Sequence, residues 1–361
     1  MGEVRLRAVR DVVIAGAGMA GLVAAARALE LGAEVDVYEK GDRAGGSMYL
    51  SSGVVWRYRE WERFREECPK GDPALQRLVW ERLDDDVAWL ESLGAPVVAR
   101  ETGNELTTGL RFDPKGLTET LARRAGAIRL LEPLTDLPDA GPVILATGGF
   151  QGSAEMVRTY ITPEAGSLLL RSNPWSTGDG LRLGRSRGAE LSAGMDEFYG
   201  RNLAAAPRIT EADFVPLAQV YAMHATVENL AGRRYEPRSW SDIDVVQWTA
   251  RQPGARARYI VPDDALDEWV RERTVGDLIE NALRAGAPVE RRNGSTVVEV
   301  VAGITTTLGG LRVDVDARAA DGLYAAGADV GGISTGGWSS ALAAALVLGK
   351  LAAESAIASS G

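Results

Sequence analysis

The chain has 361 residues, 45% of them hydrophobic and 25% charged, which is typical of a globular protein and excludes disordered, collagenous and fibrous classes. Its 40 Lys and Arg and 50 Asp and Glu residues give a net charge of −10, which argues against nucleic acid or an anionic membrane surface as the main partner. One cysteine, Cys68, excludes an intrachain disulfide, and no Cys or His spacing predicts a metal site. One histidine, His224, excludes any mechanism that needs two. At roughly 100–200 residues per domain we expect two domains, in a soluble and cytoplasmic protein.

The N-terminal region is interpreted as part of the fold and not as a signal peptide or membrane span. Residues 12–29 are apolar and follow several arginines, as a signal peptide would. They contain three glycines and Arg27, however, and lack a small-residue cleavage site.

The first glycine-rich segment is typical of a dinucleotide-binding turn. A β-branched run over Asp11–Ala15 predicts a buried parallel strand, and a helix is predicted over residues 22–31. Between them, Gly16 permits a tight turn, Gly18 lets the backbone approach a pyrophosphate, and Gly21 lets the helix pack closely on the strand. The phosphates would then bind at the helix N-terminus, where free N–H groups favour anions.

An acidic residue completes this pattern. A second strand is predicted over residues 34–38, and Glu39 follows it, 18 residues after Gly21. That spacing is close to the roughly 20 expected for an acid that binds the ribose hydroxyls of FAD or NAD. A second group of glycines and hydroxyls favours FAD, because an NAD site does not need it: Gly45, Gly46, Ser47, Ser52 and Gly53.

Residues 40–53 resemble the loop that wraps the flavin in the family of fumarate reductases, succinate dehydrogenases and 3-ketosteroid dehydrogenases. Three later segments resemble the same family in the same order: PVILATGGF at 142–150, STGDGLRLGRSRGAEL at 176–191 and GLYAAGADVGG at 322–332. A helix is then predicted over the Ala-rich residues 341–355, with Ser339 and Ser340 at its first turn. Its N-terminus would lie against the flavin and stabilise the negative charge of the reduced form.

The resemblance implies FAD as the cofactor. Respiratory relatives attach the flavin to a histidine near the first Gly-Gly pair, where this chain has Ser47-Met48-Tyr49, so we expect non-covalent FAD. The cofactor-binding residues that the resemblance and the glycine pattern imply are Gly16, Gly18, Met19, Ala20, Gly21, Glu39, Lys40, Gly45, Gly46, Ser47, Ser52, Gly53, Ala146, Thr147, Gly148, Asp179, Gly327, Asp329, Ser339, Ala341 and Leu342.

The resemblance also implies an α/β fold, in which a Rossmann-like FAD-binding domain carries an inserted α+β substrate-capping domain. We place the first part of the FAD-binding domain at residues 1–195, the cap at 196–295 and the second part at 296–361. Within the cap, helices are predicted over residues 262–270 and 274–285.

The residues that bind dicarboxylates in this family are missing. The proton-donating arginine of the fumarate reductases should lie eight residues after Arg234, where this chain has Asp242. Ser334 stands in place of a family histidine, and the arginine that follows that histidine is deleted. Fumarate and succinate are therefore not expected to be substrates.

Five side chains remain as candidates for the substrate site. Tyr199 is the first choice for the acid or base, and the alternative is a tyrosine that packs the cap. His224 is either a catalyst or a hydrogen-bonded core histidine. Arg201 and Arg234 would bind an anionic or carbonyl oxygen or form ion pairs, and Trp338 would wall the pocket or only pack.

We therefore expect an FAD-dependent oxidoreductase that transfers a hydride between flavin N5 and a C–C bond next to a carbonyl. The substrate would be a neutral or ring-containing small molecule, and an external electron donor or acceptor would complete the cycle. One alternative is a flavin oxidase or electron-transfer flavoprotein. Another is a degenerate family member that binds FAD or a ligand without catalysis.

Overall fold

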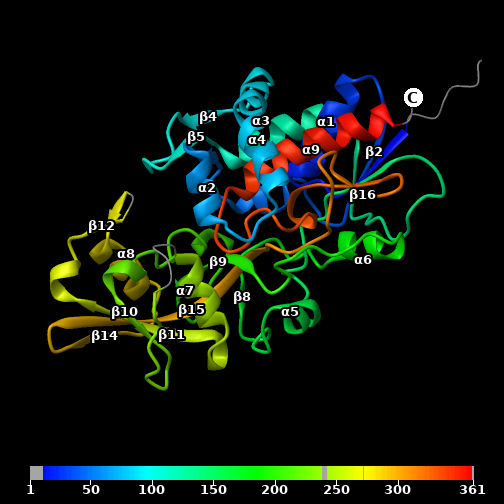
Figure 1. Cartoon of the computed structure of the whole chain (residues 1–361). Helices are drawn as coiled ribbons and strands as arrows, with labels where there is room; N and C mark the ends of the chain where they lie inside the picture. The colour runs from blue at the N-terminus through cyan, green and yellow to red at the C-terminus, as the bar shows by residue number, and fades with distance from the viewer. Residues whose placement is uncertain (1–10, 238–241, 271, 360–361) are drawn as a thin grey trace, which may run out of the picture.

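The computed structural model describes residues 11–237, 242–270 and 272–359. Within them, six strands form a sheet in the order β16-β17-β7-β1-β2-β6. In that order, their bounds are Arg318–Ala320, Leu323–Ala325, Val143–Leu145, Asp11–Ala15, Glu34–Glu39 and Ile128–Leu130. Every neighbouring pair is parallel except β16 and β17, which are antiparallel. The α/β class is therefore confirmed, with a sheet built from both ends of the chain (Figure 1).

Helices α1 (Met19–Glu30) and α9 (Ala341–Ala358) pack against each other and against the central strands of this sheet. Both are rich in alanine, and a Cβ atom on Gly349 would lie 2.5 Å from the carbonyl oxygen of Ala20. The two helix backbones therefore touch, which only small side chains permit. Among the described residues, α9 is the one helix long and apolar enough to cross a membrane, and most of it is buried in this core.

A second sheet forms around the long strand β15 (Ser295–Thr307), which pairs with four other strands. These are β8 (Leu169–Leu170), β9 (Phe198–Ala204), β11 (Arg256–Pro262) and β14 (Val289–Arg292), and β10 (Thr226–Glu228) extends the sheet beyond β11. Helices α7 (Asp242–Ala250) and α8 (Val275–Arg284) pack against strands of this sheet. Its hydrophobic core is separate from the first and contains the fully buried rings of Tyr221 and Tyr259.

Strand β15 crosses the domain boundary that we predict at residue 296. Its first half pairs with β11 and β14 and places Val298 and Val300 in the second core. Its second half pairs with β9 and places Ala302 and Ile304 in the first core. The strand therefore belongs to both halves of the molecule and connects them, as its course in Figure 1 shows.

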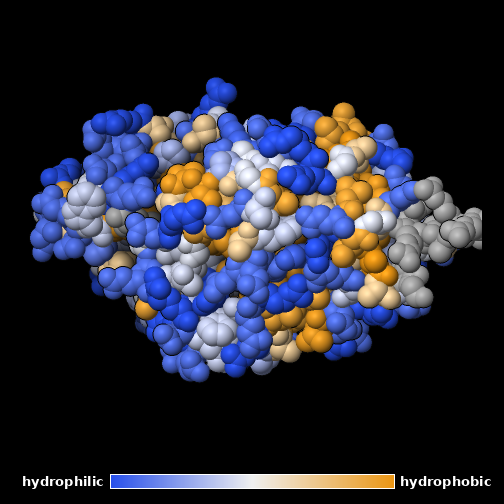
Figure 2. Space-filling model, turned by 90° about the horizontal axis from the view of Figure 1, so that it is seen from above, coloured by the Kyte–Doolittle hydropathy of each residue, from blue (hydrophilic) through white to orange (hydrophobic). Residues whose placement is uncertain are grey.

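The remaining elements complete the first half. A three-stranded sheet is formed by β3 (Val54–Tyr58), β5 (Thr107–Phe112) and β4 (Val97–Ala99). The other helices are α2 (Trp61–Glu67), α3 (Pro73–Ser92), α4 (Pro114–Arg124), α5 (Ala154–Tyr160) and α6 (Asp179–Ser186). Short 3₁₀ turns that bear on the site are η1 (Gly46–Leu50), η2 (Glu211–Asp213), η3 (Ala222–His224) and η6 (Gly327–Asp329). On the face shown in Figure 2, polar residues cover most of the surface and apolar residues form separate patches.

The helix predicted over residues 262–270 is wrong. The chain leaves β11 at Pro262, makes a 3₁₀ turn at Asp263–Ala265 and enters a two-stranded hairpin, β12 (Trp269–Val270) and β13 (Arg273–Thr274). The segment offers a helix too few apolar residues on one face, since Asp263 and Asp264 are exposed and Ala265 alone is buried within the turn.

The other predicted helices are confirmed with shifted ends. The helix predicted over 274–285 is α8, and Thr274 caps it by accepting a hydrogen bond from the backbone N–H of Asp277. The first helix begins at Met19, three residues earlier than predicted, because Gly18 serves as its N-cap. Helix α9 continues to Ala358.

Candidate functional site

The two glycine-rich segments predicted from the sequence lie against each other. The backbone N–H of Gly45 donates to the carbonyl of Ala17 at 2.8 Å, and Gly18 and Gly45 form a parallel bridge. A Cβ atom on Gly46 would lie 3.2 Å from the Cα atom of Gly18. The start of α1 and the start of η1 therefore form one continuous backbone surface.

Glycine is required for different reasons at the three positions of the first turn. A Cβ atom at Gly16 would lie 2.2 Å from the carbonyl oxygen of Ala146, and one at Gly21 would lie 1.9 Å from that of Gly16. Gly16 also has a φ of +104°, which disfavours other residues. At Gly18 the nearest atom to such a Cβ is the Cα atom of Gly46, at 4.0 Å. The protein's own packing thus explains Gly16 and Gly21 and leaves open space at Gly18.

This open space lies at the N-terminus of α1, which has no side-chain cap and no acidic residue in its first turn. Unpaired N–H groups and the helix dipole favour an anion at such a position. The geometry at Gly18 therefore fits the pyrophosphate of a dinucleotide.

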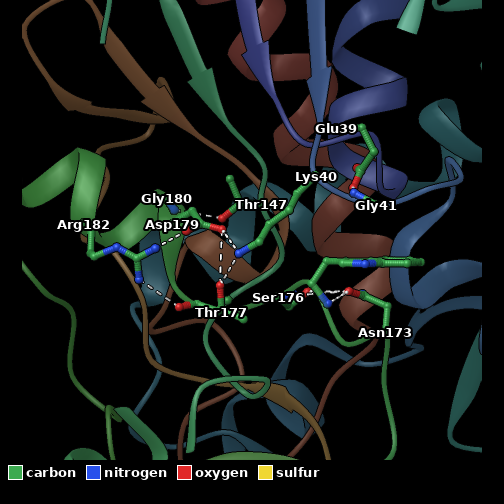
Figure 3. Close-up of polar contacts among 12 residues, drawn as sticks. Glu39, Lys40, Gly41, Thr147, Asn173, Ser176, Thr177, Asp179, Gly180 and Arg182 are labelled. Carbon is green, nitrogen blue, oxygen red and sulfur yellow. Dashed lines mark hydrogen bonds and ion pairs between the residues drawn. The ribbon is translucent and has the colours of Figure 1, made fainter. Parts of the chain in front are cut away.

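Glu39 closes the other side of the turn. Its buried carboxylate accepts hydrogen bonds from the backbone N–H groups of Ala17 at 2.7 Å and Gly41 at 2.6 Å. The next residue, Lys40, donates to Thr177 Oγ1 at 2.6 Å and to Asp179 Oδ2 at 2.9 Å (Figure 3). The structure thus brings the predicted residues Glu39, Lys40 and Asp179 to the carboxyl end of β2, where an open parallel sheet binds ligands.

Asp329 lies in η6, just after strand β17, and its carboxylate binds the backbone just after strand β7. Its fully buried carboxylate accepts hydrogen bonds from the backbone N–H of Thr147 at 2.6 Å and of Gly149 at 2.9 Å, and from the Thr147 hydroxyl. Burial raises the pKa of Asp329 to about 6, although the hydrogen bonds from Gly149 and Thr147 act in the opposite direction. A Cβ atom on Gly180 would lie 2.2 Å from Asp329 Oδ2, so the start of α6 reaches the same point.

A pocket opens at the N-terminus of α9. Its lining includes Thr306 and Thr307 from β15, Gly327 from η6, and Ser334, Trp338 and Ala341 around the start of the helix. Within the described part of the chain, the buried Thr307 Oγ1 has no hydrogen-bond partner, so it is available to a ligand. Ser340 caps α9 by accepting from the N–H of Ala343 at 3.2 Å, and the hydroxyls of Ser339 and Ser334 lie 2.6 Å apart.

Other predicted cofactor residues have different surroundings. Ser52 is exposed, and a Cβ atom on Gly53 would lie 2.0 Å from the carbonyl oxygen of Phe112, so packing alone requires that glycine. Leu342 follows Ala341 on α9 and is half-buried.

Sequence reasoning missed a buried polar group beside η1. The hydroxyl of Ser47 lies 2.6 Å from that of Ser172 and accepts from the amide of Asn173 at 2.8 Å. The amide of Gln151 in turn donates to Ser172 Oγ at 3.2 Å. Ser172 and Asn173 come from a loop without a glycine pattern, where polarity before STGDG is the signal that could have found them, and Gln151 directly follows the ATGGF segment.

Tyr199 lies next to the pocket. Its ring stacks on Trp338, with the ring centroids 3.7 Å apart and the planes 14° from parallel. Tyr199 also faces Thr306 in the ladder between β9 and β15. Trp338 and Thr306 both line the pocket, so two direct neighbours of Tyr199 belong to the pocket wall.

Arg201 is the nearest cation on the same strand. It is buried, its guanidinium lies 5.2 Å from the centre of the Tyr199 ring, and its Nη1 lies 3.4 Å from Asp242 Oδ2. Burial disfavours the charged form of Arg201, but Tyr199 and Asp242 outweigh this effect and raise the pKa of the guanidinium. The sequence identified Asp242 only as the position where a family arginine is missing. In the structure its carboxylate is the ionic partner of Arg201.

The other two predicted catalytic residues lie on the segments around β10. His224 is half-buried at the end of η3, and Arg234 is exposed and forms a backbone bridge with Glu228. Glu197, which was not selected from the sequence, contacts the turn that precedes α9. Its carboxylate accepts from the backbone N–H of Gly336 at 2.5 Å and pairs with Lys70 Nζ at 3.0 Å.

A parallel sheet with paired glycine turns at its carboxyl edge, an acid after the second strand and a pocket at the last helix defines a dinucleotide-binding flavoprotein. The family model described as FAD binding domain matches residues 11–130 and 135–340. The chain belongs to this family, as the sequence predicted, and is an FAD-dependent oxidoreductase.

Individual proteins are similar over most of the chain. A fumarate reductase (cytochrome) of Shewanella frigidimarina is 24% identical over 96% of this chain and 76% of its own length. A vinyl phenol reductase of Lactiplantibacillus plantarum is 27% identical over 53% of this chain and 48% of its own. The solved 3-ketosteroid-Δ4-(5α)-dehydrogenase of Rhodococcus jostii RHA1 shares 19% identity, with a TM-score of 0.71 over 96% of both chains. This last likeness establishes the fold.

Proposed function

We propose that this protein reduces or oxidises a C–C bond next to a carbonyl in a neutral or ring-containing small molecule. The proposal rests on the position of Tyr199, which stacks on Trp338 and pairs with Thr306 between β9 and β15. Both partners line the pocket at the N-terminus of α9. Bound FAD would supply the hydride chemistry, as acceptor or donor toward the substrate carbon.

The residues that would hold FAD follow from the geometry. The open backbone at Gly18 and the N-terminus of α1 would bind the pyrophosphate, and Glu39 would bind the adenosine ribose. The pocket at α9 would receive the flavin, where Thr307 offers an unpaired hydroxyl and the helix dipole stabilises negative charge. We expect FAD to be held without a covalent bond.

Tyr199 would handle the proton that accompanies the hydride. In the direction of reduction its phenol donates a proton to the substrate carbon, and in the direction of oxidation its phenolate accepts one. Trp338 lines the pocket and stacks on the Tyr199 ring, which limits the movement of this ring beside the pocket.

The charges around the site favour a neutral substrate. Arg201 is buried and paired with Asp242, so it is not free to bind a carboxylate. Asp242 also places a negative charge where fumarate reductases of this family have an arginine. Two similar proteins act on or bind ring compounds, since one is a vinyl phenol reductase and the other is solved with 4-androstene-3,17-dione.

The cycle also needs an external electron donor or acceptor. No haem or iron–sulfur ligand pattern is present in the sequence, so a separate partner would exchange electrons with the flavin. We propose the cytoplasm as its location and a soluble donor or acceptor as its partner.

The test is a panel of enones, steroids, vinyl phenols and fumarate. Each is mixed anaerobically with the purified holoenzyme, once with the flavin oxidised and once after its reduction with dithionite, while flavin absorbance is followed. We expect a ring-containing substrate to change the flavin redox state and fumarate to leave it unchanged. Tyr199→Phe should lower turnover by about 10²–10⁴-fold while FAD stays bound. Tyr160→Phe, on α5, serves as the control and should turn over normally.

Two results would contradict the proposal. Unchanged turnover in Tyr199→Phe would exclude this tyrosine as the acid or base. A flavin that no compound in the panel reduces or oxidises, but that air reoxidises rapidly, would indicate a flavin oxidase. Release of free FAD on acid denaturation tests the non-covalent attachment separately.

A further inference from the structure

Strand β9 presents two ionisable side chains on one face. Side chains alternate along a strand, so Tyr199 and Arg201 point the same way. Glu197 lies just before the strand and is anchored by Lys70 and Gly336, and Tyr199 is anchored by Trp338. Tyr199 therefore shares its face of the strand with the buried guanidinium of Arg201, and the Glu197 carboxylate is held by contacts of its own.

Arg201 is a buried cation with a long contact to its anionic partner, Asp242. The closest approach of Arg201 Nη1 to Asp242 Oδ2 is 3.4 Å, and the Asp242 side chain keeps 18% of its surface exposed. The guanidinium of Arg201 also lies 5.2 Å from the centre of the Tyr199 ring. A buried guanidinium at this distance from the Tyr199 ring favours a negative charge on the phenol oxygen of Tyr199.

The other charged groups near this strand have partners of their own. Just after α7, Arg251 donates to the carbonyls of Gln247 and Asp196. Arg171, beyond β8, donates to the Phe214 carbonyl and to Thr305 Oγ1. Both are cations, so they add to the positive potential of Arg201 and do not neutralise it, and each is held toward its own acceptors. His224, on the turn packed against α7, and the fully buried Tyr259 of β11, which interacts electrostatically with Arg201 and Asp242, are further titratable side chains of the surrounding elements.

We infer that Arg201, held in place by Asp242, is a positioning residue that stabilises the phenolate of Tyr199 and so lets this tyrosine exchange its proton near neutral pH. The inference rests on the proposed function and adds how the acid or base is tuned. An unperturbed tyrosine ionises near pH 10, too high for efficient proton transfer at physiological pH. Asp242 opposes the effect of Arg201 in part, because its own negative charge disfavours a phenolate nearby.

The two partners of Tyr199 therefore predict shifts of opposite sign. Removing the cation with Arg201→Met should raise the pH at which Tyr199 ionises by about one to three pH units. Removing the anion with Asp242→Asn should lower it, since the guanidinium then acts without opposition. Arg256→Met, which breaks the pair between Arg256 and Glu299 on the same sheet, is the matched control and should cause no shift.

The measurement is a pH titration of the holoenzyme labelled with ¹³C at the Cζ atom of tyrosine, followed by NMR. The Tyr199 signal is the one that disappears in Tyr199→Phe. If Arg201→Met does not fold, Arg201→Lys provides a variant that keeps a positive charge at this position. In Arg201→Lys, Tyr199 should ionise at a pH between those expected for the wild type and Arg201→Met. Identical midpoints in the wild type and Asp242→Asn, or shifts of the same sign in Arg201→Met and Asp242→Asn, would overturn the inference.

This titration needs no substrate, so its outcome is separate from that of the proposed function. If Tyr199→Phe abolishes turnover while all variants titrate alike, the tyrosine is the acid or base without tuning by Arg201. If the midpoints shift as expected but Tyr199→Phe turns over normally, the proposed function fails and the electrostatic coupling stands. For an active enzyme, the pH profile of kcat should move in the same direction as each NMR midpoint.

Discussion

The carboxylate of Glu197 accepts a hydrogen bond from the backbone N–H of Gly336 at 2.5 Å and thereby joins strand β9 to the turn before α9. The same turn carries Trp338, on which Tyr199 stacks. Glu197 is buried, whereas Lys70, its ionic partner, has 69% of its side chain exposed. The hydrogen bond to Gly336 is therefore the contact of Glu197 that fixes the turn.

The difference between these two contacts of Glu197 predicts the order in which three variants lose stability. Glu197→Ala leaves the half-buried N–H of Gly336 without its acceptor and should lower the free energy of unfolding by about 1–3 kcal/mol. Glu197→Gln keeps an acceptor oxygen and should have a smaller effect. Lys70→Ala removes an exposed ion pair and should change stability by less than about 1 kcal/mol. Thermal unfolding with turnover on the same samples tests the order, and an effect of Lys70→Ala as large as that of Glu197→Ala would contradict it.

The glycines of the first turn give a second prediction. Gly18→Ala adds a methyl group to open space at a φ of −78°, so the protein should fold with a change of less than about 1 kcal/mol and still lose FAD affinity. Gly21→Ala instead forces a Cβ against the carbonyl oxygen of Gly16 and should destabilise the fold by about 1–3 kcal/mol or more. Melting temperature and bound flavin per chain separate the two effects. Full FAD occupancy in Gly18→Ala would argue against the pyrophosphate position.

The first strand, helix and second strand could be predicted from the sequence because their signals are local. Apolar runs, glycine spacing and a terminal acid all lie within residues 11–39, and the structure follows them within a few residues. The helix predicted over residues 262–270 failed because a short mixed segment satisfies a helix and a hairpin almost equally, and contacts with the sheet decide between them.

Contacts between distant segments could not be predicted in this way. Ser47 and Ser172 are 125 positions apart and meet only because two loops cross at η1. The sequence selected both Tyr199 and Trp338 but gave no sign that their rings stack. It identified Asp242 as the absence of an arginine, while the fold makes the same residue the counter-ion of Arg201.

A buried ion pair between two helices predicts a large effect on stability. Lys350 Nζ on α9 lies 2.6 Å from Asp86 Oδ1 on α3, and only 2% of the Asp86 side chain is exposed. Lys350→Met leaves this carboxylate buried without its main partner and should cost about 3–5 kcal/mol. The double variant Asp86→Leu/Lys350→Met should recover most of that loss, because it removes both charges. Urea denaturation measures both, with Arg284→Ala at the exposed pair with Glu280 as a control that should change little.

Asp329 predicts a specific pH dependence of stability. Its folded pKa is raised by burial to about 6 from an ordinary value of 3.8, so the protonated carboxyl favours the folded state. The resulting stabilisation is fully present below about pH 4 and is lost as the pH rises through about 6, by up to about 3 kcal/mol. Asp329→Asn cannot titrate, so its free energy of unfolding should lack this decline, although its amide leaves one of the N–H groups of Thr147 and Gly149 without an acceptor. Urea titrations of both flavin-free proteins between pH 4 and pH 7 should give a stability difference, wild type minus variant, that falls across this range. A difference that is constant or rises with pH would show that Asp329 is ionised throughout, held by its hydrogen bonds against the cost of burial.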